Sequence, residues 1–327
     1  MMPLVVVVAF SCVVVLPITL QVFPALFGFL GTAWAIFTFQ AIEAVGLIGI
    51  LWWFQPHDPE TWPGISAWRE ALEWKPFCTY MTLGVGGMLA SSEWMYWEAL
   101  ALFIGTLGVV PLSVHTIPTQ VIMVMFMVPL GIGIALSVRL GTTLPQSVKR
   151  AKQLVAGTFV VGLTMLGIMA VFLYVYRYWI FRIFSEDPEV LELAEQIWWR
   201  VVLYFINLSI FGINMGVAIG LGMQWTLGFV TVLFLWLLGM PAAYYFAIYR
   251  GGGLVVAWSW IVPPYAAINV ALMFAYLTKD WDEIAAAIRL REGIERGDSD
   301  IEGLTLNETH ETGSNGYGSA STAAVVQ

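Results

Sequence analysis

The stretch between Pro76 and Val138 carries only two charged side chains, Glu93 and Glu98. Its other residues are mostly apolar, and the stretch is long enough for two membrane-spanning helices of about 20 residues each. A carboxylate near the bilayer centre costs about 2.5–3.5 kcal/mol on insertion scales, so such residues usually face a bundle interior or a water-filled pathway. The two glutamates are therefore the first candidates for a functional site.

The composition indicates a membrane protein. Hydrophobic residues make up 59% of the 327-residue chain and charged residues only 11%, and a soluble domain cannot bury that much apolar surface. The net charge of −8 is concentrated in residues 279–327, which hold ten acidic and four basic side chains. The remainder is close to neutral, so no nucleic-acid-binding surface is predicted.

Uncharged runs, glycines and prolines predict an all-α polytopic membrane protein with about eight transmembrane helices. Two helices are expected within residues 1–54, and a proline-containing linker at residues 55–75 is predicted to be cytoplasmic. Six more helices are expected within residues 76–278. The first five predicted spans cover residues 4–22, 28–54, 79–104, 112–138 and 153–176; the next two divide near residues 220–224, and the last ends near residue 277.

Local signals support this division. Pro24 and Gly28 predict a break between the first two spans, and a signal peptide is the alternative for the first, although a basic leading region is missing. Asp187-Pro188-Glu189 matches an N-cap, a proline at the first helical position and an early acid, so a helix is expected to begin there. Pro263-Pro264 falls inside the last span, where it predicts either a structural kink or a break that lines a site.

The basic residues predict the orientation. The loop at residues 140–152 holds Lys149, Arg150 and Lys152 without any acidic side chain, and short basic loops stay in the cytoplasm. Both chain ends are then predicted to be cytoplasmic as well.

The end of the chain changes in character. An amphipathic helix is expected over residues 279–293, with Trp281, Ile284 and Ile288 on an apolar face that lies on the membrane surface. Residues 294–327 are rich in glycine, serine, threonine and acids, and they are predicted to be disordered.

Helix geometry separates the two glutamates. Five residues correspond to a rotation of about 140° on a helix, so Glu93 and Glu98 cannot both point at one partner. Glu93 shares a face with Tyr96 and Trp97, whereas Glu98 shares a face with Trp94.

The sequence offers no enzyme motif. It has three histidines and two cysteines, and it lacks an HExxH motif, the cysteine spacing of a zinc site, a phosphate-binding Gly-Lys-Ser/Thr and a Gly-x-Ser-x-Gly elbow. The chain is therefore predicted not to be an enzyme, and neither a metal nor a cofactor is expected.

Two segments resemble a known family. Glu93-Trp94-Met95-Tyr96-Trp97-Glu98 resembles the Glu-Trp-x-x-Tyr-Glu signature in the seventh transmembrane helix of eukaryotic multidrug and toxic compound extrusion (MATE) transporters. The segment 128–141 is similar to the Val-Pro-x-Gly-x-x-x-Ala-x-Ser-Val-Arg-Val-Gly stretch that ends the eighth helix. Its matching residues, for which a structural role is expected, are Pro129, Gly131, Ser137, Arg139 and Gly141. Weaker matches at residues 184–190 and 216–224 extend the resemblance.

The resemblance implies the fifth to twelfth helices of a twelve-helix transporter made of two six-helix lobes, truncated at its N-terminus. Residues 1–54 would belong to an incomplete N-terminal lobe and residues 76–278 would form the C-terminal lobe. The implied function is a secondary active antiporter that exports xenobiotic or metabolite cations in exchange for a proton or Na⁺. The implied location is the plasma membrane or the vacuolar or lysosomal membrane. One alternative is a non-transporting remnant of such a transporter. The other is a lipid or polysaccharide flippase, which would need basic residues inside its spans to bind phosphate headgroups, and no basic residue is expected inside the spans of this chain.

This chain matches the acidic site of the family only in part. Gln120 stands where the family has a glutamate, and Leu208 stands where it has an acid, with Asn207 and Asn214 nearby. The predicted proton- or cation-binding residues are Glu93, Glu98 and Gln120, and the predicted substrate-lining residues are Trp94, Tyr96, Trp97, Asn207 and Asn214. A carboxylate removed from water holds either a proton or a cation, and aromatic rings add cation–π contacts.

Overall fold

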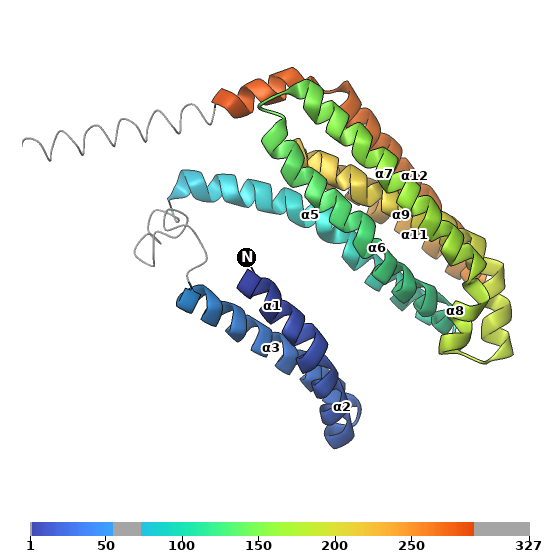
Figure 1. Cartoon of the computed structure of the whole chain (residues 1–327). Coiled ribbons are helices and arrows are strands. Elements are labelled where there is room, and N and C mark those ends of the chain that lie inside the picture. Colours follow the sequence, from blue (N-terminus) through green and yellow to red (C-terminus); the bar gives the residue numbers. More distant parts are fainter. Residues whose placement is uncertain (1, 55–72, 291–327) are drawn as a thin grey trace, which may run out of the picture. The chain divides into compact units, whose positions relative to one another are not determined.

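The computed structural model describes residues 2–54 and 73–290, and within these ranges every regular element is a helix (Figure 1). The described residues fall into two compact units, which divide between Thr79 and Tyr80. Most of the predicted 55–75 linker and the whole predicted tail at 294–327 lie outside the described residues.

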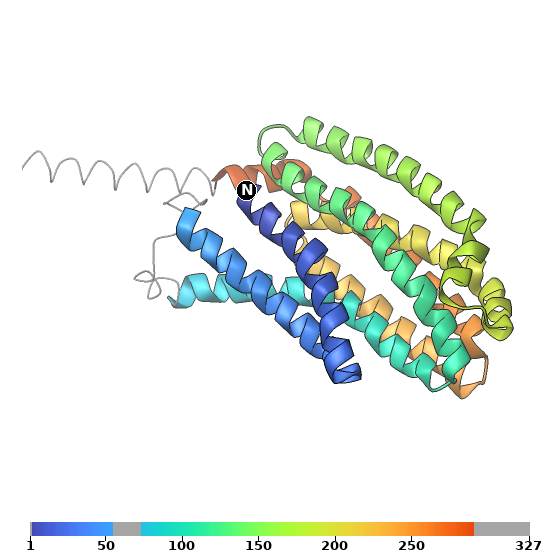
Figure 2. The same ribbon diagram turned by 60° about the horizontal axis from the view of Figure 1, so that its bottom comes forward.

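The first unit is a helical hairpin (Figure 2). Its first arm is a continuous rod made of α1 (Met2–Phe10), the π-helical η1 (Ser11–Val15) and α2 (Leu16–Phe27). The chain turns at Gly28, whose φ of 58° favours glycine, and returns as α3 (Phe29–Phe54). The predicted turn is confirmed at Gly28, but Pro24 lies inside α2 and the first span is longer than predicted.

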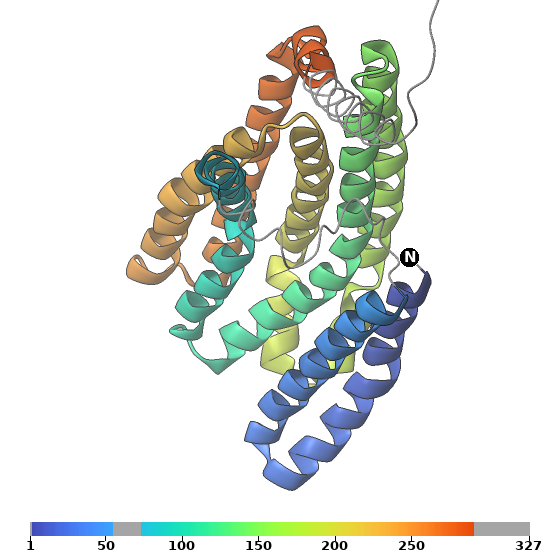
Figure 3. The same ribbon diagram turned by 90° about the vertical axis from the view of Figure 1, so that its left-hand side faces the viewer.

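The second unit is a bundle of long helices. After α5 (Trp74–Gly105), which begins before the boundary, come α6 (Val109–Thr143), α7 (Val148–Val175), the short α8 (Arg177–Phe184) and α9 (Pro188–Gly220). One rod then contains α10 (Gln224–Thr231), η4 (Val232–Gly239), α11 (Met240–Ala243) and η5 (Tyr244–Tyr249), with π-helical turns in η4 and η5; α12 (Gly253–Thr278) follows. Helix α9 contacts α6, α7 and α12, so it is the central element of the bundle (Figure 3).

The helix boundaries follow from local chemistry. The Asp187 side chain accepts a hydrogen bond from the Glu189 backbone N–H at 3.0 Å, with Pro188 at the first helical position, which confirms the predicted start of α9. The Ser147 side chain caps α7 by accepting from the Arg150 backbone N–H. Gly108, with φ of 116°, makes the turn between α5 and α6.

Seven helices in the described part of the chain are long and apolar enough to cross a membrane. They are Val5–Phe27, Phe29–Phe54, Val109–Thr143, Val148–Val175, Pro188–Gly220, Gln224–Tyr249 and Gly253–Thr278. The remaining predicted span, the third along the chain at residues 79–104, corresponds to α5, which has 32 residues and is not among the seven. The chain is an integral, multi-pass, all-α membrane protein.

The helix at residues 281–290 differs from the prediction in one respect. Asp280 accepts hydrogen bonds from the backbone N–H groups of the next turn and so begins the helix. Trp281 is buried, and Ile284 and Ile288 pack against the bundle core. The apolar face therefore covers the bundle, where the sequence predicted that it lies on the membrane surface.

The closest approach of two helices in the bundle is between α6 and α9. A Cβ atom added at Gly133 would collide with the backbone carbonyl of Gly212, and one added at Gly216 would collide with the backbone of Gly133. Small residues of this kind let membrane helices pack closely.

Among the motif residues of α6, Gly131 and Gly141 have no such contacts, whereas the Ser137 carbonyl would lie 3.0 Å from a Cβ atom added at Gly220 of α9. A Cβ atom at Gly131 or Gly141 would meet no atom within 4 Å, Arg139 is exposed, and the Ser137 hydroxyl donates within its own helix to the Ile134 carbonyl at 2.8 Å. Only Pro129 of the five is buried. Gly133, rather than Gly131, is the glycine that the packing requires.

We predict that Gly133→Ala destabilises the protein by about 1–3 kcal/mol, because the added methyl group forces α6 away from α9. Gly131→Ala, on the same helix but in open space, is the matched control and should be neutral or slightly stabilising. Unfolding of the purified variants in detergent, followed by circular dichroism, measures the difference. Equal stability of the two variants would show that the helices separate without cost.

Candidate functional site

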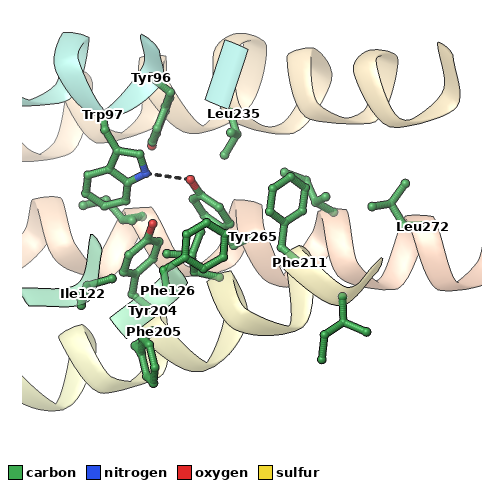
Figure 4. Packing of buried hydrophobic residues seen from close by; sticks show 14 of the residues in the cluster. Tyr96, Trp97, Ile122, Phe126, Tyr204, Phe205, Phe211, Leu235, Tyr265 and Leu272 are labelled. Atoms are coloured by element: carbon green, nitrogen blue, oxygen red, sulfur yellow. Dashed lines mark hydrogen bonds between the residues drawn. The ribbon is translucent and has the colours of Figure 1, made fainter. Parts of the chain in front are cut away.

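Glu93 is buried inside the second unit, with 5% of its surface exposed. Its Oε1 accepts a hydrogen bond from the Tyr265 hydroxyl of α12 at 2.7 Å. The same hydroxyl accepts a hydrogen bond from the Trp97 indole N–H at 2.8 Å (Figure 4). Because an indole N–H can only donate, the Tyr265 proton is directed at the Glu93 carboxyl.

Aromatic rings from four helices surround this hydrogen-bonded chain. The Trp97 ring of α5 lies 4.6 Å from the Tyr204 ring of α9 and stacks on His115 of α6 at 5.9 Å, centroid to centroid. The Tyr265 ring lies 5.1 Å from Tyr204, and Trp258 of α12 packs 6.1 Å from Trp97. The carboxyl group is thus held where α5, α6, α9 and α12 meet.

A small hollow adjoins Glu93. It has a volume of about 10 Å³ and is lined by Glu93, Trp94, Trp97, Thr119, Ile122, Met123, Phe126, Tyr204 and Leu208. Pockets for drug-sized ligands are usually about 300–1,000 Å³, whereas about 10–15 Å³ holds a single water, so the hollow is far too small for an organic cation in this conformation. Leu208, where the resemblance implies an acid, is part of its apolar wall. Glu93 is the only carboxylate among the lining residues.

The other two residues of the predicted ion-binding set lie elsewhere. Glu98 and Gln120 are both exposed and line no part of the hollow. Glu98 shares an exposed face of α5 with Trp94, as helix geometry predicts. Thr119, the neighbour of Gln120, faces the hollow in its place because one residue rotates a helix by about 100°. Of the three residues in the predicted set, only Glu93 lines the hollow.

Asn207 and Asn214 join α9 to α12 and do not line the hollow. The Asn214 amide donates to Asn269 Oδ1 at 2.9 Å, and Tyr276 donates to Asn214 Oδ1 at 3.0 Å. The Asn269 amide donates to the Asn207 backbone carbonyl at 2.8 Å. In the structure both asparagines belong to a hydrogen-bond network between two helices.

Among the predicted substrate-lining aromatic residues, Trp94 and Trp97 line the hollow and Tyr96 does not. Tyr96 is fully buried, and its ring packs 6.2 Å from Trp236. Its hydroxyl has no hydrogen-bond partner within the described ranges.

Sequence reasoning missed Tyr265, the direct partner of Glu93. The available signal is Pro263-Pro264, which predicts either a structural kink or a break that lines a site. Helix α12 continues through both prolines, and Tyr265 follows them directly. Within residues 2–54 and 73–290, no group of three or more His, Cys, Asp or Glu side chains is placed to hold a metal ion.

Comparisons with known proteins agree with the transporter resemblance. The MatE family model matches residues 89–245. Multidrug resistance protein MdtK of Yersinia pseudotuberculosis serotype O:1b is 30% identical over 176 residues, which cover 53% of this chain and 38% of that protein. MdtK of Edwardsiella ictaluri is 29% identical over 181 residues, covering 55% and 40%. The chain thus aligns with less than half the length of these curated relatives.

A solved structure shows the same fold. The crystal structure of the eukaryotic MATE transporter AtDTX14 superposes with a TM-score of 0.69 at 21% identity, covering 87% of this chain and 64% of that one.

We predict that Asn214→Ala costs about 1–3 kcal/mol of stability, because it leaves Asn269 and the Tyr276 hydroxyl without their buried partner. Asn207→Ala is the matched control. The Asn207 side chain bonds only to the Leu203 carbonyl of its own helix, so its loss should cost little. Thermal unfolding of the two purified variants compares them, and an equal loss would show that the network between α9 and α12 is not stabilising.

Proposed function

Since the chain belongs to the MATE family through residues 89–245, we propose that the protein is a secondary active antiporter that exports organic cations in exchange for protons or Na⁺. The observation that carries the proposal is the Glu93 carboxyl, buried among apolar helices and bonded on one side by Tyr265. The multidrug resistance proteins among its relatives support the class of substrate.

The first step of the proposed mechanism is competition at Glu93. It is the only carboxylate lining the hollow, so the site carries at most one negative charge. In the charged form it attracts a cation, and in the protonated form that attraction is lost. A proton arriving from one side of the membrane therefore displaces the cation bound from the other.

Tyr265 and Trp97 position the carboxyl group for this exchange. The hydroxyl of Tyr265 occupies one oxygen of Glu93 and is itself held by the Trp97 N–H. The proposed exchange of proton and cation takes place at this carboxyl group. Trp94 and Trp97 border the same hollow, where their rings can make cation–π contacts with a flat or quaternary cation.

The hollow has to widen for an organic cation to enter. Prolines lie within both α6 and α12 beside it, Pro118 preceding Thr119 and Pro264 preceding Tyr265. Prolines are common places for a membrane helix to bend. We propose that bending at these prolines, together with alternating exposure of the two lobes, opens the hollow.

A flippase is the less supported alternative. The expectation that no basic residue lies inside the spans is wrong for Arg200, which is partly buried on α9 and donates to Ser259 Oγ of α12 at 2.6 Å. Arg200 does not line the hollow beside Glu93, so the only charge there is negative. A phosphate headgroup would be repelled by it.

We predict that Glu93→Gln abolishes cation efflux driven by a pH gradient, because the amide keeps the shape of the side chain but cannot exchange a proton. Glu98→Gln, a matched change on the exposed face of α5, should retain most of the efflux. Efflux of ethidium by the protein expressed from its full coding sequence, normalised to correctly folded protein, measures both. Binding of ethidium to the purified chain provides a second readout.

The control separates this mechanism from a structural role. If Glu93 only joins helices, Glu93→Gln lowers the amount of folded protein but leaves efflux per folded molecule intact. Wild-type efflux after that normalisation would remove proton competition from the mechanism. Absence of efflux from the wild-type protein itself would favour the non-transporting alternative.

We predict that Tyr265→Phe raises the apparent KM for the cation about tenfold or more, because hydrogen bonds to charged groups contribute about 1.5–3 kcal/mol. Tyr96→Phe removes a hydroxyl that is equally buried but unbonded within the described residues, so its KM should stay at the wild-type value. Both variants are compared in the ethidium assay at equal folded amounts. An unchanged KM in Tyr265→Phe would show that the hydroxyl does not position Glu93.

A further inference from the structure

A second cavity lies between α8 and α9, at the level of the lipid headgroups. Helix α9 has 33 residues, about 50 Å at 1.5 Å per residue, whereas the hydrocarbon core of a bilayer is about 30 Å thick. One end of α9 therefore projects beyond the hydrocarbon. Helix α8 packs against its first turns, at the end of the bundle opposite the helix at 281–290 (Figures 1 and 2).

The surface of α8 is typical of a membrane interface. Tyr178 and Trp179 are exposed, and Arg182 lies over the Tyr178 ring at 5.0 Å. Tyrosine and tryptophan concentrate at the headgroup level because one end of each ring is apolar and the other is polar. The helix follows directly on span α7 and precedes span α9, which agrees with this depth.

The cavity has a volume of about 170 Å³ and combines a cation, an anion and aromatic rings. Arg177 and Glu195 line it from α8 and α9, together with Tyr178, Phe181 and Trp198. The Arg177 guanidinium donates to the Tyr174 carbonyl at 3.0 Å and lies over the Tyr174 ring at 4.9 Å. The hydrogen bond to Tyr174 uses one of the five N–H donors of the Arg177 guanidinium, so other N–H donors of this group can bind an anion.

The floor of the cavity is rigid. Phe181 and Trp198 are each 2% exposed, and their rings meet edge to face at 5.1 Å. The Trp198 indole N–H donates to the Leu173 carbonyl of α7 at 3.0 Å. The ring orientation is therefore fixed before any ligand arrives, which lowers the entropic cost of binding.

We infer that this cavity binds the headgroup of a zwitterionic phospholipid. Arg177 contacts the phosphate, because a guanidinium bonds phosphate oxygens through paired donors. Glu195 attracts the ammonium group. An anionic headgroup would satisfy Arg177 but would be repelled by Glu195. The exposed side chains of Val171 and Val175 on α7 provide an apolar surface for the acyl chains.

Native mass spectrometry of the full chain in detergent tests the site directly. The probes are phosphatidylethanolamine, phosphatidylglycerol and soluble phosphoethanolamine. We expect Arg177→Gln and Glu195→Gln each to weaken phosphatidylethanolamine binding about tenfold, as expected for a lost charge-assisted bond. Arg182→Gln on α8 and Glu192→Gln on α9 change the net charge identically but do not line the cavity, so their binding should stay within twofold of wild type.

Thermal unfolding with added phosphatidylethanolamine is the second measurement. The lipid should raise the Tm of the wild type and of both controls, but not that of the cavity variants. Arg177→Lys keeps the positive charge but lacks the paired N–H donors, so it should bind the lipid at an intermediate level. This variant tests the site even if the neutral variant Arg177→Gln does not fold. Equal losses in cavity and control variants, or no preference over phosphatidylglycerol, would overturn the site. Equally tight binding of soluble phosphoethanolamine would overturn its assignment to lipid.

Discussion

The burial of one carboxyl group among membrane helices governs the arrangement of the bundle around it. Placing an acid at this depth is costly unless polar partners surround it, and here the partner is the Tyr265 hydroxyl, 172 residues away in the sequence. The Trp97 indole completes the chain by fixing the direction of the Tyr265 proton. The hydrogen bonds join α5 to α12, and the rings of His115 and Tyr204, which both pack against Trp97, bring α6 and α9 to the same point.

The wall of the hollow depends on a second constraint, the close approach of α6 to α9. A Cβ atom at Gly212 would stand 3.0 Å from Cε2 of Phe126, and Phe126 lines the hollow beside Glu93. A larger residue at Gly212 would therefore displace a side chain of the site. The glycine contacts and the acidic site are two parts of one packing arrangement.

Most of the fold could be predicted from the sequence, because the signals are local. Gly28 and Asp187 mark helix ends through their own backbone and side-chain chemistry, and the 100° rotation per residue separates the buried Glu93 from the exposed Glu98. The pairing of distant helices could not be predicted in the same way. A pattern within α9 does not reveal that Asn214 meets Asn269, and spacing within α6 does not reveal that Thr119, rather than Gln120, faces Glu93. The adjacent prolines were the only local sequence signal that pointed to a site at Tyr265.

Helix α9 connects the two proposed sites. Trp198 and Glu195 border the cavity beside α8, whereas Tyr204 and Leu208 border the hollow beside Glu93. Tyr204 lies six positions after Trp198, about 9 Å along a helix axis, and none of the five residues between them is a proline or glycine that could absorb a bend. A phospholipid that holds α9 against α8 would therefore act on the same rigid segment that carries the Tyr204 wall of the ion site. Any opening of the hollow that moves this part of α9 has to move the lipid-binding residues with it, so the headgroup bound at the surface is placed to bias the conformation of the site in the interior.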